Sequence, residues 1–120
     1  MITSIDRAAH EVKTRGFAIA PGVVTTEKAA ELAGLLQECI DEDVRRFGSD
    51  GPDYWMVPNL MARHVEFAHL MENALLQKHL NNMLDNTCIV YAYTSSSMPP
   101  QKGNFSSRIH VDCPRVIPGY

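Results

Sequence analysis

The apolar repeat between Thr25 and Phe47 constrains the fold of this chain more than any other feature. Apolar residues recur there every three or four positions, at Ala29, Leu32, Ala33, Leu36, Ile40, Val44 and Phe47. Most of the positions between them are polar or charged, so the spacing predicts an amphipathic helix that buries one face. Thr25 or Thr26 is expected to cap its first turn, and Gly48 is expected to end it.

A second helical pattern runs from Val65 to Leu84 and is expected to form two helices separated near Asn73. Its leucine and methionine stripe is interpreted as core. Glu66 and His69 have the Glu-x-x-His spacing of di-iron helical bundles. A bundle needs two such motifs and further glutamates, and only one motif is present, so this alternative is not favoured. The other helical-region histidines, His64 and His79, are expected to be surface or packing residues.

Three segments have the character of strands, at about residues 16–20, 87–94 and 105–112. The first is a short apolar run stopped by Pro21-Gly22, and the second is rich in β-branched and aromatic residues. Polar loops are expected at 48–58, around Tyr54 and Trp55, and at 95–104. The order predicts an α+β fold in which a helical cover, about 25–84, packs on a sheet.

The composition indicates one domain over residues 1–120 that buries a core, because 45% of the 120 residues are hydrophobic. The net charge of −3 provides no basic footprint for nucleic acid or anionic lipid. No apolar run approaches the roughly 20 residues that cross a bilayer, and no signal peptide is recognisable at Met1. We therefore expect a cytoplasmic protein whose partner is a small molecule or a protein, with no nucleic acid and no membrane.

The three cysteines, Cys39, Cys88 and Cys113, are too widely and irregularly spaced for a disulfide framework or a zinc knuckle. Reduced thiols fit this pattern. Cys39 in a helix and Cys88 in a strand are expected to be small buried hydrophobes. Cys113 directly follows Asp112, and on a strand neighbouring side chains point to opposite faces. Cys113 is therefore not expected to bind a metal together with Asp112.

His110 and Asp112 form the pattern with the most specific chemistry. Residues two apart on a strand project from the same face, so this imidazole and carboxylate converge while Val111 points to the opposite layer. Two histidines and one carboxylate form the facial triad of non-haem Fe(II) oxygenases. The pair would supply two metal ligands, and a second histidine must come from elsewhere. The simpler alternative, an ordinary surface ion pair, also fits a His-x-Asp sequence.

The context of the pair favours the metal site. The run from Gly16 to Thr25, the amphipathic helix after it, and the segment from Arg108 to Tyr120 together resemble the phytanoyl-CoA dioxygenase family. The resemblance covers nearly the whole chain, although only the His-x-Asp part is chemically specific. It implies a double-stranded β-helix, the jelly-roll or cupin-like barrel, with the N-terminal helices packed outside one sheet.

The resemblance also implies an activity: oxidation of a small organic substrate with Fe(II), 2-oxoglutarate as co-substrate, and O2. His110 and Asp112 would be the catalytic iron ligands. A distal histidine and a 2-oxoglutarate-binding arginine, which the family carries further along, have no counterpart here, so the chain is expected to be the N-terminal part of such an enzyme and inactive alone. A non-catalytic or degenerate module, completed by another chain or self-associating through unfinished sheets, is the alternative.

Five further residues are candidates for binding the co-substrate or substrate. Arg108 shares a strand face with the metal pair and is placed to meet an anionic ligand or to orient Asp112. Lys102 precedes the metal strand and would attract a carboxylate. The strand before it contributes three candidates, and alternation puts the two tyrosines on one face and the threonine on the other: Tyr91, Tyr93 and Thr94.

Overall fold

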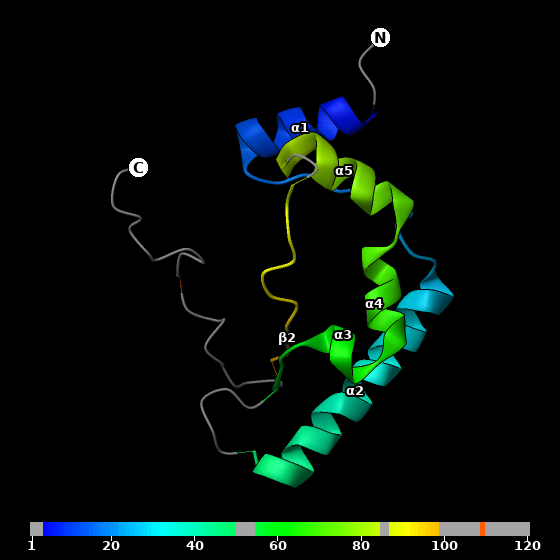
Figure 1. The fold of residues 1–120 in the computed structure, drawn as a ribbon, viewed down its shortest axis with the longest axis vertical. Helices are drawn as coiled ribbons and strands as arrows, with labels where there is room; N and C mark the ends of the chain where they lie inside the picture. The colour runs from blue at the N-terminus through cyan, green and yellow to red at the C-terminus, as the bar shows by residue number, and fades with distance from the viewer. Residues whose placement is uncertain (1–3, 50–54, 85–86, 99–108, 110–120) are drawn as a thin grey trace.

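The computed structural model describes residues 4–49, 55–84, 87–98 and 109. Its elements are α1 (Ser4–Arg15), α2 (Thr26–Phe47), β1 (Met56–Val57), α3 (Leu60–Arg63), α4 (Val65–Met71), α5 (Ala74–Leu84) and β2 (Ser95–Ser96). Figure 1 shows α3 and α4 packed together next to α2, while α1 packs against α5 at the other end of the molecule. The described residues therefore form a mixed fold of helices and a small antiparallel sheet.

The predicted helix over 25–47 is confirmed as α2. The Thr25 side chain accepts a hydrogen bond from the Lys28 N–H at 3.1 Å, which satisfies a donor of the first turn. Gly48 ends the helix with a φ of 83° and donates its N–H to the Val44 carbonyl at 2.9 Å. Both ends of α2 are thus set by residues that the sequence identified.

The buried face of α2 is shifted from the predicted stripe. Cys39 and Ile40 are buried, and Leu32, Leu35, Leu36 and Val44 pack partly against the core. Ala29 and Ala33 are exposed, and the Phe47 side chain is 73% exposed. The apolar spacing located the helix, but which of its apolar residues become buried depends on the elements that pack against it.

The predicted break near Asn73 is confirmed, since α4 and α5 lie on either side of it. The Asn73 Oδ1 accepts hydrogen bonds from the N–H groups of Leu75 and Leu76 at 3.0 and 3.1 Å. Its Nδ2 donates to the Val23 carbonyl at 2.8 Å. Asn73 therefore caps α5 and also ties its start to the segment before α2.

Two helices were not predicted. In α1, Ile5, Ala8, Ala9 and Val12 have helical spacing and are half-buried, and α1 packs against α5. The helix ends at Gly16, whose φ is 84° and whose N–H donates to the Val12 carbonyl at 2.9 Å. The other helix, α3, is a single turn of four residues. A turn this short carries no periodic signal of its own.

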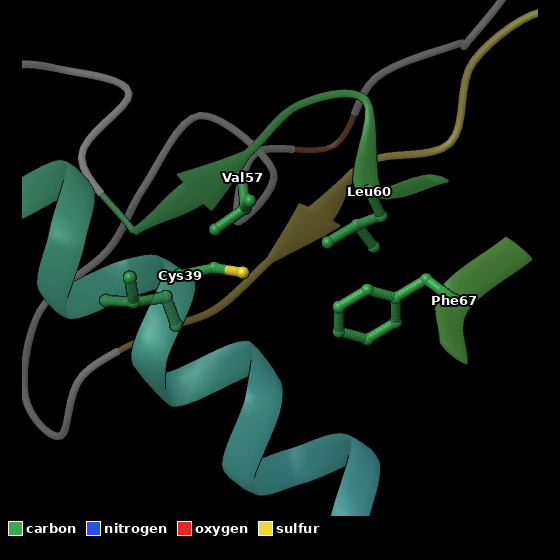
Figure 2. Packing of buried hydrophobic residues seen from close by; sticks show 5 residues of the cluster. Cys39, Val57, Leu60 and Phe67 are labelled. Atoms are coloured by element: carbon green, nitrogen blue, oxygen red, sulfur yellow. The ribbon is translucent and has the colours of Figure 1, made fainter. Parts of the chain in front are cut away.

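The core lies where α2, β1, α3 and α4 meet. Its buried members are Cys39, Ile40, Val57, Leu60 and Phe67. Figure 2 shows the side chains of Cys39, Val57, Leu60 and Phe67 directed toward one another from these four elements. Val57 is fully buried. The short β1 thus contributes a residue that closes the core between two helices.

The predicted strand at 16–20 is wrong. Phe17–Ala20 follows α1 as irregular backbone, with the side chains of Phe17 and Ile19 54% and 78% exposed. The Arg15 guanidinium lies 4.9 Å from the centre of the Phe17 ring. A strand forms only beside a partner that takes its backbone hydrogen bonds. No described segment pairs with these residues.

The predicted strand at 87–94 is also wrong. Thr87 lies in a turn and the following residues form no ladder with any described segment. Pairing occurs instead at Ser95–Ser96, within the predicted 95–104 loop, where β2 runs antiparallel to β1 with Met56 opposite Ser96 and Val57 opposite Ser95. Cys88 is exposed, contrary to expectation, whereas Cys39 is buried as predicted. High β-propensity indicates suitability for a pleated surface and does not supply the partner strand.

The predicted jelly-roll barrel does not appear in the part of the chain that the structure describes, which contains only the two-stranded β1–β2 sheet. The predicted strand at 105–112 lies outside the described residues except for Ile109, which is fully exposed and belongs to no strand. The described residues contain both helices and a small sheet, as an α+β fold requires, and this is the part of the predicted fold class that the structure shows.

Candidate functional site

The predicted metal ligands, His110 and Asp112, lie outside the described residues, as do the candidate co-substrate contacts Lys102 and Arg108. Cys113 lies there too. The prediction of a metal pair therefore rests on the His-x-Asp sequence. What the structure describes is the chain that leads toward this pair, from Thr87 to Met98.

The three candidates in that segment have different surroundings. Tyr93 is half-buried and packs against the core, and burial raises the pKa of its phenol. Tyr91 is 91% exposed and Thr94 is exposed. The two tyrosines do not share one environment as strict strand alternation predicts, because the backbone here is not part of a ladder. Tyr93 is the candidate that the fold places against other elements.

Backbone hydrogen bonds hold Tyr93 and the residues after it. The Leu60 N–H donates to the Tyr93 carbonyl at 2.9 Å, and the Ser97 N–H donates to the Trp55 carbonyl at 3.0 Å. The β1–β2 ladder lies between these two bonds. Trp55 has a φ of 68°, which is rare for a bulky residue, and it packs partly against the core. Trp55, at the centre of the predicted 48–58 loop, thus anchors this part of the chain to the core.

Arg63 joins α3 to α2 through several charged contacts. Its Nη1 donates to Asp43 Oδ1 and Oδ2 at 2.8 and 2.9 Å, and its Nη2 donates to Glu42 Oε2 at 2.8 Å. Nη2 also lies 3.4 Å from the Cys39 carbonyl oxygen. Burial lowers the pKa of this guanidinium, but the hydrogen bonds to Asp43 and Glu42 outweigh it, so the pKa is raised overall. Sequence spacing offered no signal for this cluster, because its members are about 20 residues apart.

Glu66 and His69, the alternative metal pair, lie in a different ionic cluster. The Glu66 Oε2 accepts a hydrogen bond from the Lys28 Nζ of α2, and Glu66 Oε1 lies 3.6 Å from His69 Nδ1. The hydrogen bond from Lys28 lowers the pKa of Glu66, and the same bond raises the pKa of Lys28. Among the described residues, no group of three or more potential metal ligands is assembled. The contacts of Glu66 fit an interhelical ion pair.

His64 has a local structural role that the sequence interpretation allowed but did not specify. Its Nδ1 accepts a hydrogen bond from the Glu66 N–H at 3.2 Å, so the imidazole caps the start of α4. Its ring also meets the Phe67 ring edge-on, with 6.5 Å between centroids. Histidine is not among the commonest capping residues, which explains why this start signal was not recognised.

No family model, curated protein or solved structure matches this chain. The resemblance to phytanoyl-CoA dioxygenases is therefore carried by the motifs of the sequence alone. Across the part of the chain that the structure describes, no helix combines the length and the apolar character that crossing a membrane requires.

Proposed function

We propose that this chain contributes His110 and Asp112 to the iron centre of a non-haem Fe(II)- and 2-oxoglutarate-dependent dioxygenase that hydroxylates a small organic substrate. The observation that carries the proposal is the His-x-Asp sequence, which follows a predominantly helical region and an uncharged, β-prone segment. The resemblance to phytanoyl-CoA dioxygenases rests on the run from Gly16 to Thr25, the amphipathic helix after it and the segment from Arg108 to Tyr120. The mixed α and β content of the described residues is compatible with it.

The donor atoms of the pair suit ferrous iron. One imidazole nitrogen and one carboxylate oxygen are two of the three donors in a 2-His-1-carboxylate site, and neither is the thiolate that would favour zinc. When bound, iron with 2-oxoglutarate and O2 supplies the oxidation of a C–H bond, with succinate and carbon dioxide as products. A second histidine from another segment would complete the ligand set.

The chain's other residues would bind and orient rather than oxidise. Arg108, two positions before His110, is proposed to meet an anionic group or to hold the Asp112 carboxylate in its ligating orientation. Lys102 is proposed to attract a carboxylate of the co-substrate. Tyr93 is the strongest of the remaining candidates, because it is anchored to the core while its phenol is half-buried.

The compartment proposed for this activity is the cytoplasm. Cys39 and Cys88 are free thiols, and the spacing of all three cysteines is not that of a disulfide framework. A reducing environment also keeps the proposed metal in its ferrous state.

A second candidate function is a non-catalytic module that binds or assembles with another chain. The observation that favours it is the exposure of Ile89, Val90 and Tyr91, whose side chains are 84%, 52% and 91% exposed. Consecutive exposed apolar residues with β-propensity are available for pairing with another strand. This candidate does not need His110 or Asp112, which distinguishes it from the dioxygenase.

Metal binding is the direct test of the dioxygenase proposal. Anaerobic titration calorimetry with Fe(II) is expected to detect binding by the wild-type protein that His110→Ala and Asp112→Ala each abolish or weaken at least about tenfold, since each removes a ligand. His10→Ala is the matched control, because His10 is an exposed residue of α1. Equal affinities for all four proteins would exclude the predicted pair as the iron site.

Turnover is the second arm of the test. The complete enzyme, in which another segment supplies the second histidine, is expected to form succinate from 2-oxoglutarate in the presence of Fe(II), ascorbate and O2, and Asp112→Ala is expected to abolish it. Metal binding without any succinate, with or without candidate substrates, would favour the non-catalytic module.

A further inference from the structure

We infer that Arg63 is a positioning residue that fixes the Tyr93–Ser97 segment to α2 and thereby sets the place of Tyr93. The importance of this for catalysis rests on the proposed function, in which Tyr93 contacts the co-substrate or substrate. The coupling itself rests on contacts between described residues. It runs from α2 through α3 and β1 to the chain that precedes the metal motif.

The first step is the attachment of Arg63 to α2. Its guanidinium meets both oxygens of Asp43 and one oxygen of Glu42, all within 2.9 Å. The side chains of Arg63 and Asp43 are only 22% and 21% exposed. Half-buried, charge-assisted hydrogen bonds to a planar fork constrain orientation as well as distance. The position of Arg63 relative to α2 is therefore tightly defined.

The second step is that α3 is held at both of its ends. It is one turn of four residues, from Leu60 to Arg63, and the His64 N–H closes it on the Leu60 carbonyl at 3.3 Å. A helix this short has no stability of its own, so tertiary contacts at its ends must hold it. Leu60 supplies one by burial in the core, and Arg63 supplies the other. The two middle residues, Met61 and Ala62, are exposed.

The third step is the contact between α3 and the candidate segment. The Leu60 N–H donates to the Tyr93 carbonyl at 2.9 Å, while β1, just before α3, pairs with β2. The Ser97 N–H extends this contact to the Trp55 carbonyl at 3.0 Å. Tyr93 is thus held by its backbone to α3 and by its ring to the core. Releasing α3 from α2 loosens both attachments.

Hydrogen exchange tests the coupling without any catalytic assay. In Arg63→Met, which keeps the apolar stem, the amides of Leu60 and Ser97 are expected to exchange on the order of tenfold faster than in wild type. The backbone N–H of Gln77 in α5 donates to the Asn73 carbonyl at 2.9 Å. Its exchange rate is expected to stay that of wild type, which would show that the rest of the fold is intact. Arg63→Lys is expected to restore part of the protection, because it keeps the charge but not the fork.

The matched control is Arg46→Met. Arg46 is an exposed residue in the last turn of α2, and its guanidinium lies 5.0 Å from the centre of the Phe47 ring. This variant is expected to leave the Leu60 and Ser97 rates unchanged. Wild-type protection at Ser97 in Arg63→Met, or equal acceleration at Ser97 and Gln77, would overturn the inference.

Kinetics test its consequence for the proposed site. In the complete enzyme, in which another segment supplies the second histidine, Arg63→Met is expected to raise the KM for 2-oxoglutarate several-fold with a smaller change in kcat, and Arg63→Lys is expected to recover part of the loss. An unchanged KM would overturn the link to the site. If wild-type protein forms no succinate, the proposed function fails, and hydrogen exchange still decides whether Arg63 positions the segment.

Discussion

The helix α2 and the segment 87–94 are both rich in apolar residues, yet only one of them forms regular structure. In α2 the apolar face packs into the core, with Cys39 and Ile40 buried. In 87–94 the side chains of Ile89 and Tyr91 are 84% and 91% exposed, and the backbone forms no strand ladder with any described segment. A helix satisfies its hydrogen bonds within one segment, whereas a strand depends on a neighbour. Apolar sequence alone therefore predicts the first much better than the second.

The largest expected effect is a difference in how much substitutions in the two regions lower the free energy of unfolding. Phe67→Ala, in the core against α2, is expected to lower the free energy of unfolding by about 3 kcal/mol, because it removes a buried ring and leaves a cavity. Tyr91→Ala removes an exposed ring from the other region and is expected to change it by less than about 0.5 kcal/mol. Urea denaturation followed by circular dichroism measures both. Similar losses would show that 87–94 is packed in solution.

The next effect tests whether the helical region is defined by local caps. Asn73→Ala removes two hydrogen bonds to the first turn of α5 and one to the Val23 carbonyl. We expect a loss of about 1–2 kcal/mol in the free energy of unfolding. The exposed Asn81 of α5 provides the control, since Asn81→Ala should be nearly neutral. An equally small effect of both changes would mean that packing against α1 suffices to hold α5.

A smaller effect is expected from pH, through the ion pair that joins α2 to α4. The hydrogen bond from Lys28 lowers the pKa of Glu66 in the folded protein. The ion pair therefore stabilises the fold fully above the ordinary carboxyl pKa of about 4.5, and this stabilisation is lost as the pH falls through the lowered pKa of Glu66. The pKa of Lys28 is raised, so the contribution of its charge to stability is lost only as the pH rises above about 10.5. Thermal melts of wild type between pH 6 and pH 3 should therefore fall more steeply than those of Glu66→Gln.

The control for this prediction is Glu72→Gln, an exposed carboxylate just after α4. Its melts should follow those of wild type over the same range. If Glu66→Gln also follows wild type, the pair between α2 and α4 contributes nothing measurable to stability.

The smallest effect on stability, but a clear one on association, is expected from Ile89→Lys. Ile89 is 84% exposed, so the free energy of unfolding should change by less than about 0.5 kcal/mol. A lysine there should reduce self-association, because a charge in a β-prone segment opposes edge-to-edge pairing. Light scattering across a concentration series measures this. A wild-type protein that stays monomeric at all concentrations would show that residues 87–94 do not mediate self-association.

The pattern of correct and wrong predictions follows the range of the interactions involved. The bounds of α2 and the break at Asn73 were predictable, because the residues that set them lie within a turn of the feature they define. The β1–β2 ladder joins residues about 40 positions apart, and Arg63 joins α3 to carboxylates about 20 positions away. Neither leaves a local pattern. The strands predicted at 16–20 and 87–94 failed for the same reason, since propensity does not identify a partner.

The sequence by itself determined α2 with the caps at its two ends, the two helices on either side of Asn73, and the His110-Val111-Asp112 pattern on which the proposed iron site depends. These features depend on spacing along one segment, where backbone geometry fixes which side chains share a face. Only the tertiary structure decided that Tyr93 is anchored while Tyr91 is exposed, and that Arg63 connects α2 to the chain before the proposed ligands. Burial and pairing depend on neighbours, and those neighbours are distant in the sequence.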